Sequence, residues 1–320
     1  MDQNLIESPS LTSVTFLDFP LVTDLDALDA DIAILGIPFG MPYDASAMAN
    51  DQSRAPDAIR QFLSMWDIAY SRHHFDFDLG GPLLDGRDIK VADCGNVTAD
   101  RYDHKQHFLR AEQAARKIFK HGATLITLGG DHGVPIPVMR ALEVFDQKVT
   151  LVQVDAHLDW RHEIHGETDG YSSPIRRASE MPWIDAIVQI GLRGIGSART
   201  PEVEDAIAYG AKLIDAYEMH TIGMDAVLDQ IPDGGPYYLT IDADGLDPTI
   251  MPAVMAQTPG GLTWLQMRAL LHGLVRKGRV LGMDLVEIAP SYDVGNITLI
   301  HAERLICNFI GACVRADYYE

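Results

Sequence analysis

The sequence predicts an α/β fold with a mainly parallel central sheet that is covered by helices on both faces. Several short apolar runs lack the polar alternation of a half-exposed strand, and segments with helical periodicity separate them. No linker rich in Pro, Gly or Ser divides the 320 residues. We therefore expect one domain over residues 31–320, preceded by an N-terminal arm over residues 1–30.

In the first half of the chain, apolar runs indicate strands and one-sided apolar stripes indicate helices. Residues 31–38, DIAILGIP, are rich in Ile and end in Gly and Pro, as buried strands do. Pro56 suits a first helical turn, and Ile59, Phe62 and Leu63 follow on one face. The other elements expected here are a weak strand over 89–92, a helix with Phe108, Ala111, Ala115, Ile118 and Phe119 on one side that ends at Gly122, a strand over 123–128 and a short helix over 137–144.

The second half continues the alternation of strands and helices. Its apolar runs are too short for helices and are bounded by turn residues. Strands are expected over residues 149–154, 186–192, 237–241 and 280–286, and helices over 264–275 and 299–314.

The composition excludes several classes of partner. There are 46 Asp and Glu residues against 25 Lys and Arg, a formal charge of -21 at pH 7. This charge repels phosphate backbones and anionic lipids, so we expect no nucleic-acid or membrane partner. The N-terminus lacks a signal-peptide pattern, and no stretch approaches the roughly 20 apolar residues that span a bilayer. The only cysteines, Cys94, Cys307 and Cys313, form no CxxC pair, which favours a cytoplasmic protein.

Acidic and imidazole side chains follow three of the expected strands. GGDH (residues 129–132) follows the strand over 123–128, DAHLD (155–159) follows 149–154, and DADGLDP (242–248) follows 237–241. The carboxyl ends of parallel strands are where open α/β sheets bind their ligands, so these segments are expected to meet at one edge. Residues two apart in an extended strand end point to the same side. The candidate metal ligands are His132, Asp155, His157, Asp159, Asp242 and Asp244.

Each motif alone also fits a structural role, because His after Gly-Gly can cap a helix and DxD can form a solvated turn. Together they bring many carboxylates to one place, and buried like charges need compensation that divalent cations supply. Nitrogen and oxygen ligands without cysteine favour manganese over structural zinc, with nickel, cobalt or iron as chemical alternatives. The number of carboxylates indicates two ions, about 3.5 to 4 Å apart, that share a water.

GGDH, DAHLD and DADGLDP, in this order, resemble the arginase and agmatinase (ureohydrolase) family over most of the chain from about residue 30. Four further segments resemble its agmatinase-like branch. They are SPIRRA (173–178), QIGLRGIG (189–196), PGGLTW (259–264) and DLVEIAP (284–290). The resemblance implies a three-layer α/β/α arginase-type fold, a binuclear manganese centre, and hydrolysis of a guanidino group to urea and an amine by hydroxide formed on the metals.

The resemblance also implies roles for individual residues. One ion would be held by His132, Asp155, Asp159 and Asp242, and the other by Asp155, His157, Asp242 and Asp244. Asp155 and Asp242 would then bridge the two ions. Glu287 would accept hydrogen bonds from the substrate guanidinium, for which a carboxylate is a planar acceptor. Asp244 would relay a proton to the departing amine.

The sequence departs from the family around the substrate and keeps the metal ligands. Tyr171 and Ser172 stand where many members have His-Gly, and a tyrosine with a pKa of about 10 is a poor proton shuttle. His162 or His165 could substitute, or both could be exposed loop residues. Gly133 stands where Ser or Thr is common. We take Tyr171 and His165, with Glu287, as candidate substrate contacts; Asp44, Asn50, Asp51 and Gln52 could line the entrance or lie on an exposed loop.

The leading hypothesis is therefore an agmatinase-like hydrolase with two divalent ions, manganese or else nickel, and a small cationic guanidino substrate. Agmatine or a guanidinoalkyl acid such as guanidinobutyrate or guanidinopropionate is the simplest substrate, and a substituted guanidine, a biguanide such as metformin, or formiminoglutamate is the alternative. Zinc deacetylases are disfavoured because they lack the second aspartate of DAHLD. A non-catalytic subunit is the alternative from another class. The resemblance implies trimers or hexamers, of this chain alone or with a paralogous subunit.

Overall fold

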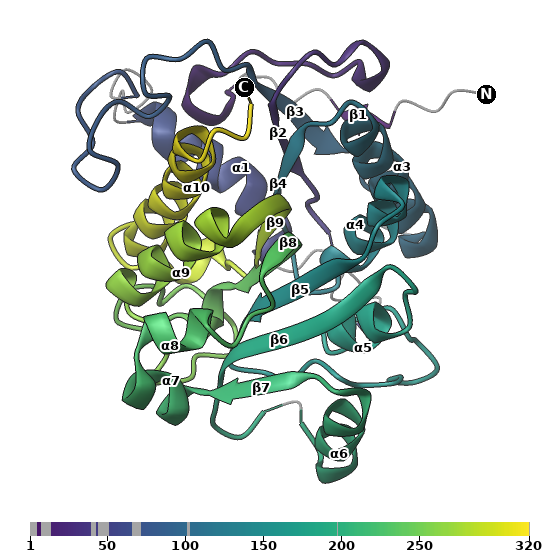
Figure 1. Ribbon diagram of the computed structural model, residues 1–320. Coiled ribbons are helices and arrows are strands. Elements are labelled where there is room, and N and C mark those ends of the chain that lie inside the picture. Colours follow the sequence, from purple (N-terminus) through teal and green to yellow (C-terminus); the bar gives the residue numbers. More distant parts are fainter. Residues whose placement is uncertain are drawn as a thin grey trace.

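In the computed structural model, residues 5–7, 14–39, 43, 51–65, 72–100, 103–196 and 198–319 are described. Within these residues one sheet has the strand order β1-β3-β2-β4-β9-β8-β5-β6-β7 (Figure 1). β1 is antiparallel to β3, and the other neighbouring pairs are parallel. The strands are β1 (Ile6–Glu7), β2 (Ile32–Gly36), β3 (Val91–Val97), β4 (Thr124–Leu128), β5 (Val149–Val154), β6 (Ile184–Leu192), β7 (Lys212–Asp215), β8 (Gly234–Asp242) and β9 (Gly278–Val286).

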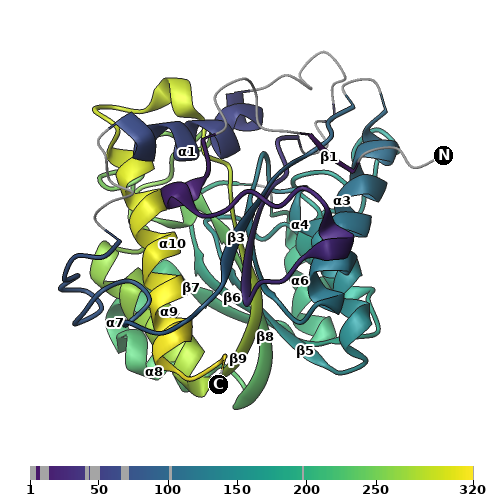
Figure 2. The same ribbon diagram turned by 90° about the horizontal axis from the view of Figure 1, so that it is seen from above.

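Helices cover both faces of this sheet, as Figure 2 shows from above. The helices of one face are α1 (Ala55–Met65), α7 (Ala216–Ile222), α8 (Met224–Leu228), α9 (Trp264–Lys277) and α10 (Ile297–Arg315). Those of the other face are α3 (His104–Lys120), α4 (Pro135–Ala141), α5 (Pro174–Ser179) and α6 (Thr200–Tyr209). The three-layer α/β/α class is thus confirmed.

The sheet separates two hydrophobic cores, and single strands contribute to both. Ile32 and Ile34 of β2 pack in the core with α1, α9 and α10. Ala33 and Leu35, which alternate with them, pack in the core with α3 and α4. Because both faces of a central parallel strand are buried, its sequence reads as a continuous apolar run.

The weak strand expected over residues 89–92 is a longer strand, β3, over Val91–Val97. The expectation stopped early because Asp93 and Asn96 are polar, yet both are buried. Arg60 of α1, which is 1% exposed, pairs with both carboxylate oxygens of Asp93 at 2.8 Å and donates to Asn96 Oδ1 at 2.6 Å. A tertiary partner therefore turns a polar sequence into a buried strand. Among the described helices and strands, β1, α5, α6, β7, α7 and α8 have no counterpart in the sequence-based assignment.

The described part of residues 1–30 packs against the rest of the chain. Ile6 and Glu7 pair with β3, and Phe16, Leu17 and Leu25 are buried. Whether residue 30 is a domain boundary stays a prediction.

By length and composition, α10 is the one described helix that could cross a membrane. Its most apolar window is 78% buried within the fold, which is typical of the core helix of a globular domain. It carries Glu303 and Arg304, which fit a helix inside a protein better than one in lipid.

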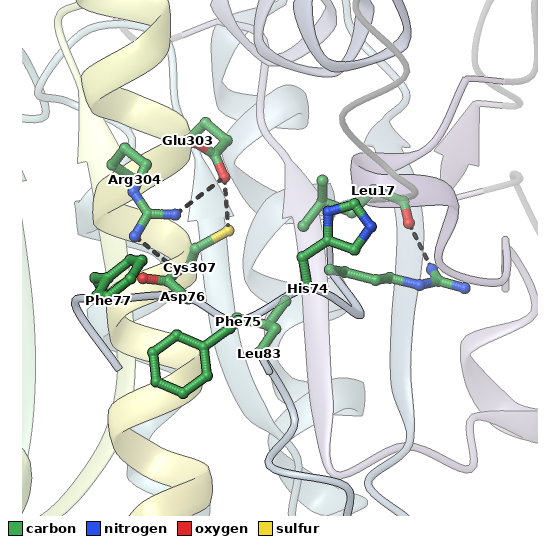
Figure 3. Close-up of a pocket in the computed structure, with 10 residues that line it drawn as sticks. Leu17, His74, Phe75, Asp76, Phe77, Leu83, Glu303, Arg304 and Cys307 are labelled. Atoms are coloured by element: carbon green, nitrogen blue, oxygen red, sulfur yellow. Dashed lines mark hydrogen bonds and ion pairs between the residues drawn. The ribbon is translucent and has the colours of Figure 1, made fainter. Parts of the chain in front are cut away.

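A pocket of about 360 Å³ lies between α10 and the segment 72–83 (Figure 3). Arg304 pairs there with Asp76 and Asp78 at 2.7 Å, and the thiol of Cys307 donates to Glu303 at 2.9 Å. None of the residues predicted to act in function lines this pocket.

The buried pair of Arg60 and Asp93 predicts a large effect on stability. Arg60→Met leaves the Asp93 carboxylate buried without its cation and should lower the free energy of unfolding by about 3 to 5 kcal/mol. Arg54→Met removes an exposed pair with Asp51 and should lower it by less than about 1 kcal/mol. Urea unfolding of both variants measures the difference, and equal effects would contradict this role of Arg60.

His107 predicts a specific pH dependence of stability. Its ring is buried and its Nε2 lies 2.8 Å from the carbonyl of Phe39 after β2. Burial lowers the pKa of His107 below its ordinary 6.5, so the unfolded chain binds an additional proton as the pH falls below 6.5. Stability should therefore fall on acidification, with a contribution from His107 of at most about 1.4 kcal/mol per pH unit.

The measurement is the unfolding free energy of wild type and His107→Gln between about pH 5 and 8. The variant should show the shallower slope. Parallel curves for the two proteins would show that His107 does not contribute.

Candidate metal centre

The predicted metal ligands and Glu287 lie at the carboxyl edge of four neighbouring strands, β4, β9, β8 and β5 (Figure 1). Residues 129–132 follow β4, residues 155–159 follow β5, and Glu287 follows β9. Asp242 ends β8, and Asp244 lies in the 3-10 helix η6 (Ala243–Gly245). Strand order thus brings residues from distant parts of the chain to one place.

One group of side chains surrounds the Nδ1 atom of His132. Carboxylate oxygens of Asp155 and Asp159 lie 3.0 Å from this atom, and one of Asp242 lies 3.1 Å from it. All four residues are at most 3% exposed. Three carboxylates thus lie within hydrogen-bond distance of one buried nitrogen, and the ligand atoms of His132, Asp155 and Asp242 are also close to one another.

A second group surrounds the Nδ1 atom of His157. It lies 3.2 Å from an oxygen of Asp244 and 3.5 Å from Oδ1 of Asp155. Asp155 turns its other oxygen, Oδ2, toward His132, so one carboxylate is shared by both groups. Among the described residues, His132, Asp155 and Asp242, and likewise Asp155, His157 and Asp244, have ligand atoms close enough to hold one metal ion.

Hydrogen bonds behind His132 fix which ring nitrogen faces the cluster. The Thr240 hydroxyl donates to Asp284 at 2.7 Å, so it accepts from the N–H at Nε2 of His132 at 3.0 Å. The Tyr238 hydroxyl donates to the other Asp284 oxygen. Nδ1 of His132 therefore faces the carboxylates. Burial lowers the pKa of His132, but Asp155, Asp159 and Asp242 outweigh it and raise the pKa well above its ordinary value, so a bound cation would take the place of the proton on Nδ1. A ring nitrogen among carboxylates is a donor set that fits a cation.

Burial and the closeness of the charges shift the pKa values of the cluster. Burial, then repulsion from Asp244 and Asp155, raises the pKa of Asp242 well above its ordinary value. Burial and Asp155 raise the pKa of Asp159 to about 7. Burial lowers the pKa of His157, but the carboxylates of Asp155 and Asp244 outweigh it and raise the value to about 12. Protons on these side chains compensate part of the negative charge. Divalent cations would compensate more of it.

Two close approaches of the backbone keep the groups together. A Cβ on Gly245 would lie 2.7 Å from the backbone nitrogen of Asp155, so η6 can approach the end of β5 only with glycine there. A Cβ on Gly196 would collide with the His157 ring. These glycines set the distance between the loops.

Two of the acidic residues have left-handed backbone conformations that few non-glycine residues adopt. The φ angle is 53° at Asp159 and 65° at Glu287. Each conformation costs about 1 to 2 kcal/mol, and such strain gathers at functional sites. At Glu287 the turn directs the side chain back over the site, where Oε1 accepts the backbone N–H of His132 at 2.8 Å.

Glu287 is half-buried beside the cluster and has a second partner. Burial raises its pKa to about 7, against hydrogen bonds from Gln52 and His132 that lower it. The Gln52 side-chain nitrogen donates to Oε2 at 2.9 Å. Gln52 lies in the 3-10 helix η4 (Asp51–Arg54), and Asp51 holds that helix by accepting the backbone N–H of Ser291 at 2.7 Å. Asp44 and Asn50 lie outside the described residues.

The other candidate substrate contacts lie nearer the surface. Tyr171 is 40% exposed, and its ring centroid is 4.7 Å from that of Tyr43. Burial, Tyr43, Asp131 and Glu287 raise the pKa of Tyr171, as expected for a ring at the edge of an acidic site. His162 and His165 are exposed, and His162 faces Arg177. A role of His165 in substrate binding stays a prediction.

Sequence reasoning missed the residues behind the cluster. Thr240 and Asp284 are fully buried in β8 and β9 and act through His132. Gln153 in β5 donates to Asp155 Oδ2 at 2.6 Å. The sequence did offer one signal, because Asp284 is a charged residue inside the strand expected over residues 280–286. An ionised group in a buried strand needs hydrogen-bond or charge partners.

Comparison with known proteins gives a consistent result. The model of the arginase family matches residues 30–311. A guanidinobutyrase of Pseudomonas aeruginosa is 31% identical over 88% of this chain and 86% of its own length. An agmatinase of Photorhabdus laumondii is 32% identical, with coverages of 89% and 88%.

A solved structure is similar throughout. The proclavaminate amidino hydrolase from Streptomyces clavuligerus superposes with a TM-score of 0.80 at 25% identity, covering 98% of this chain and 99% of that one. The chain therefore belongs to the arginase family and is a metal-dependent hydrolase that acts on carbon–nitrogen bonds of linear amidines.

Proposed function

We propose that the protein is an agmatinase-like enzyme that hydrolyses a guanidino compound to urea and an amine. The observation that carries the proposal is the pair of histidine and aspartate groups that share Asp155, with the Glu287 carboxylate hydrogen-bonded to the backbone of His132. This arrangement combines a place for two cations with a separate acceptor for a guanidinium.

Two divalent ions would occupy the centre. His132, Asp155, Asp159 and Asp242 would hold one, and Asp155, His157, Asp242 and Asp244 the other, so that Asp155 and Asp242 would be ligands of both. Manganese is the expected metal and nickel the alternative, because the ligands are nitrogen and oxygen only. When bound, the ions would supply the positive charge that makes water nucleophilic toward a guanidinium carbon at neutral pH.

The side chains of the chain itself bind the substrate and move the proton. Glu287 accepts N–H groups of the guanidinium in a planar, charge-assisted arrangement. The pKa of Asp244 is raised mainly by burial. Its Oδ2 takes the proton that the attacking water gives up and passes it to the amine that leaves. Asp244 is buried and Glu287 is half-buried, which strengthens these interactions because less water competes for the two carboxylates than at the surface.

Agmatine is the first substrate to consider. The Tyr43 and Tyr171 rings contact each other at a tilted angle and form an uncharged aromatic surface near Glu287, which suits an alkyl chain that ends in a cation. Guanidinobutyrate and guanidinopropionate are the next candidates. The replacement of His-Gly by Tyr171 and Ser172 favours a changed substrate, such as a substituted guanidine, a biguanide like metformin, or formiminoglutamate.

A substrate screen tests this proposal. The protein is loaded with manganese or nickel in separate samples, and urea, ammonia and the released amine are measured with each of these compounds. We expect urea from agmatine or from one of the guanidino acids. Failure to release urea, ammonia or an amine from any compound with either metal would contradict the enzymatic function and favour a non-catalytic subunit.

Assembly and location belong to the same proposal. We expect trimers or hexamers, of this chain alone or with a paralogous subunit, in the cytoplasm. The exposed side chains of Phe75 and Phe77 are apolar surface that assembly could remove from water. The three cysteines are free and buried, which suits a reducing compartment. Sedimentation of the purified protein measures the assembly.

Removal of a shared ligand should abolish both metal binding and activity. In Asp242→Asn the bridging charge is lost, and we expect kcat/KM to fall more than about 100-fold together with loss of bound metal. Asp225→Asn, at an exposed position in α8, is the control. Elemental analysis and urea release are measured on both variants, and full metal content in Asp242→Asn would refute the ligand assignment.

Glu287→Gln should separate substrate binding from metal binding. The amide keeps the size of the side chain but loses the charge that pairs with a guanidinium, so kcat/KM should fall about 10-fold or more. The metal content should stay at the wild-type value, because Glu287 is not in either ligand group. Loss of metal from this variant would assign Glu287 to the metal centre instead.

A further inference from the structure

Gln52 has an unsatisfied acceptor inside the candidate site. The residue is 5% exposed, and its Nε2 donates to Glu287 Oε2 at 2.9 Å. Its Oε1 is buried and has no hydrogen-bond partner in the described structure. Buried polar atoms nearly always have a hydrogen-bond partner. An unpaired acceptor beside the Glu287 carboxylate therefore indicates that a donor is missing.

The position of this acceptor follows from the planar amide. Nε2 and Oε1 share one carbon atom, so the unpaired oxygen lies close to the Glu287 carboxylate. The backbone around Gln52 is held in place, because Asp51 accepts the N–H of Ser291 and pairs with Arg54 at 3.2 Å. Gln52 Oε1 and Glu287 thus form a pair of acceptors on a fixed support.

A guanidinium has the donors that this pair lacks. Each of its terminal NH2 groups carries two hydrogens in the plane of the cation. An NH2 group that donates one hydrogen to Glu287 directs its second hydrogen to the side, where a neighbouring acceptor can take it. One planar nitrogen can therefore satisfy both residues.

We propose that Gln52 is a specificity-determining residue whose Oε1 accepts the second N–H of the guanidinium NH2 group that Glu287 binds. The inference rests on the proposed function and adds to it which part of the substrate is recognised. Substrates with an unsubstituted terminal NH2 group fit both acceptors. A methyl group on that nitrogen removes the hydrogen that Gln52 would accept and leaves Oε1 unpaired, so the enzyme discriminates against alkylated termini.

The alternative is that Gln52 only braces Glu287. A brace would affect every substrate equally, because its loss would misplace the carboxylate whatever the substrate carries. Recognition by Gln52 affects the ratio between two substrates that differ in one N–H. The ratio of their kcat/KM values therefore separates the two roles.

The experiment compares the preferred guanidino substrate with its analogue that carries one methyl group on each terminal nitrogen. Both are measured with metal-loaded wild type, Gln52→Met and Gln52→Asn. Methionine keeps the length of the side chain without the amide, and asparagine keeps the amide but is shorter. Gln113→Met, at an exposed position in α3, is the matched control.

We expect wild type and Gln113→Met to favour the unmethylated substrate strongly. In both Gln52 variants this preference should fall about tenfold, the size expected for one hydrogen bond from a charged donor. The fall should come mainly from the unmethylated substrate. Metal content by elemental analysis and the melting temperature show that the variants are folded and loaded, and the two substitutions guard against failure of one to fold.

The outcomes distinguish this inference from the function on which it rests. An unchanged preference in both folded Gln52 variants, with equal losses for the two substrates, would show a brace and overturn the inference alone. Wild-type protein that hydrolyses no guanidino compound with either metal would overturn the proposed function and this inference with it.

Discussion

The structure depends on the concentration of buried carboxylates at one edge of the sheet. Asp155, Asp159, Asp242 and Asp244 lie together with almost no exposure, and burial together with their mutual repulsion raises the pKa of Asp159, Asp242 and Asp244. Positive charge has to compensate this repulsion, and divalent cations do so with the best geometry. Much of the local architecture serves to hold the carboxylates close, including the close backbone approach at Gly245.

The candidate metal ligands and the candidate substrate contacts lie on different parts of the fold. The candidate metal ligands follow strands β4, β5 and β8, whose positions are fixed by the sheet, and Thr240 and Asp284 orient His132 from within it. The residues around the substrate lie on connecting segments, as Gln52 and Tyr171 do. Loops can change without loss of the sheet, so the substrate can differ between relatives while the centre stays.

Acidity also links the two charges that the site would bind. The cluster of carboxylates would bind the metal ions. Glu287 lies beside the cluster but is in neither ligand group, so its carboxylate can accept hydrogen bonds from a cationic substrate. The overall charge of -21 extends this preference beyond the site, since it favours the approach of cations and repels anions. The acidic composition therefore agrees with the proposed metal cofactor and the proposed cationic substrate. It also agrees with the expectation that nucleic acids are not partners.

The sequence by itself determined the fold class and the six candidate ligands, because apolar runs mark buried strands and polar motifs mark their ends. The strand from 149 to 154 matches the structure residue for residue, since both of its faces are buried and local pattern suffices. Only the tertiary structure decided that β3 continues through Asp93, that Thr240 and Asp284 stand behind His132, and that Gln52 reaches Glu287. These depend on partners far away in the chain: Gln52 and Glu287 are separated by 235 positions, and no local pattern encodes a hydrogen bond over that distance.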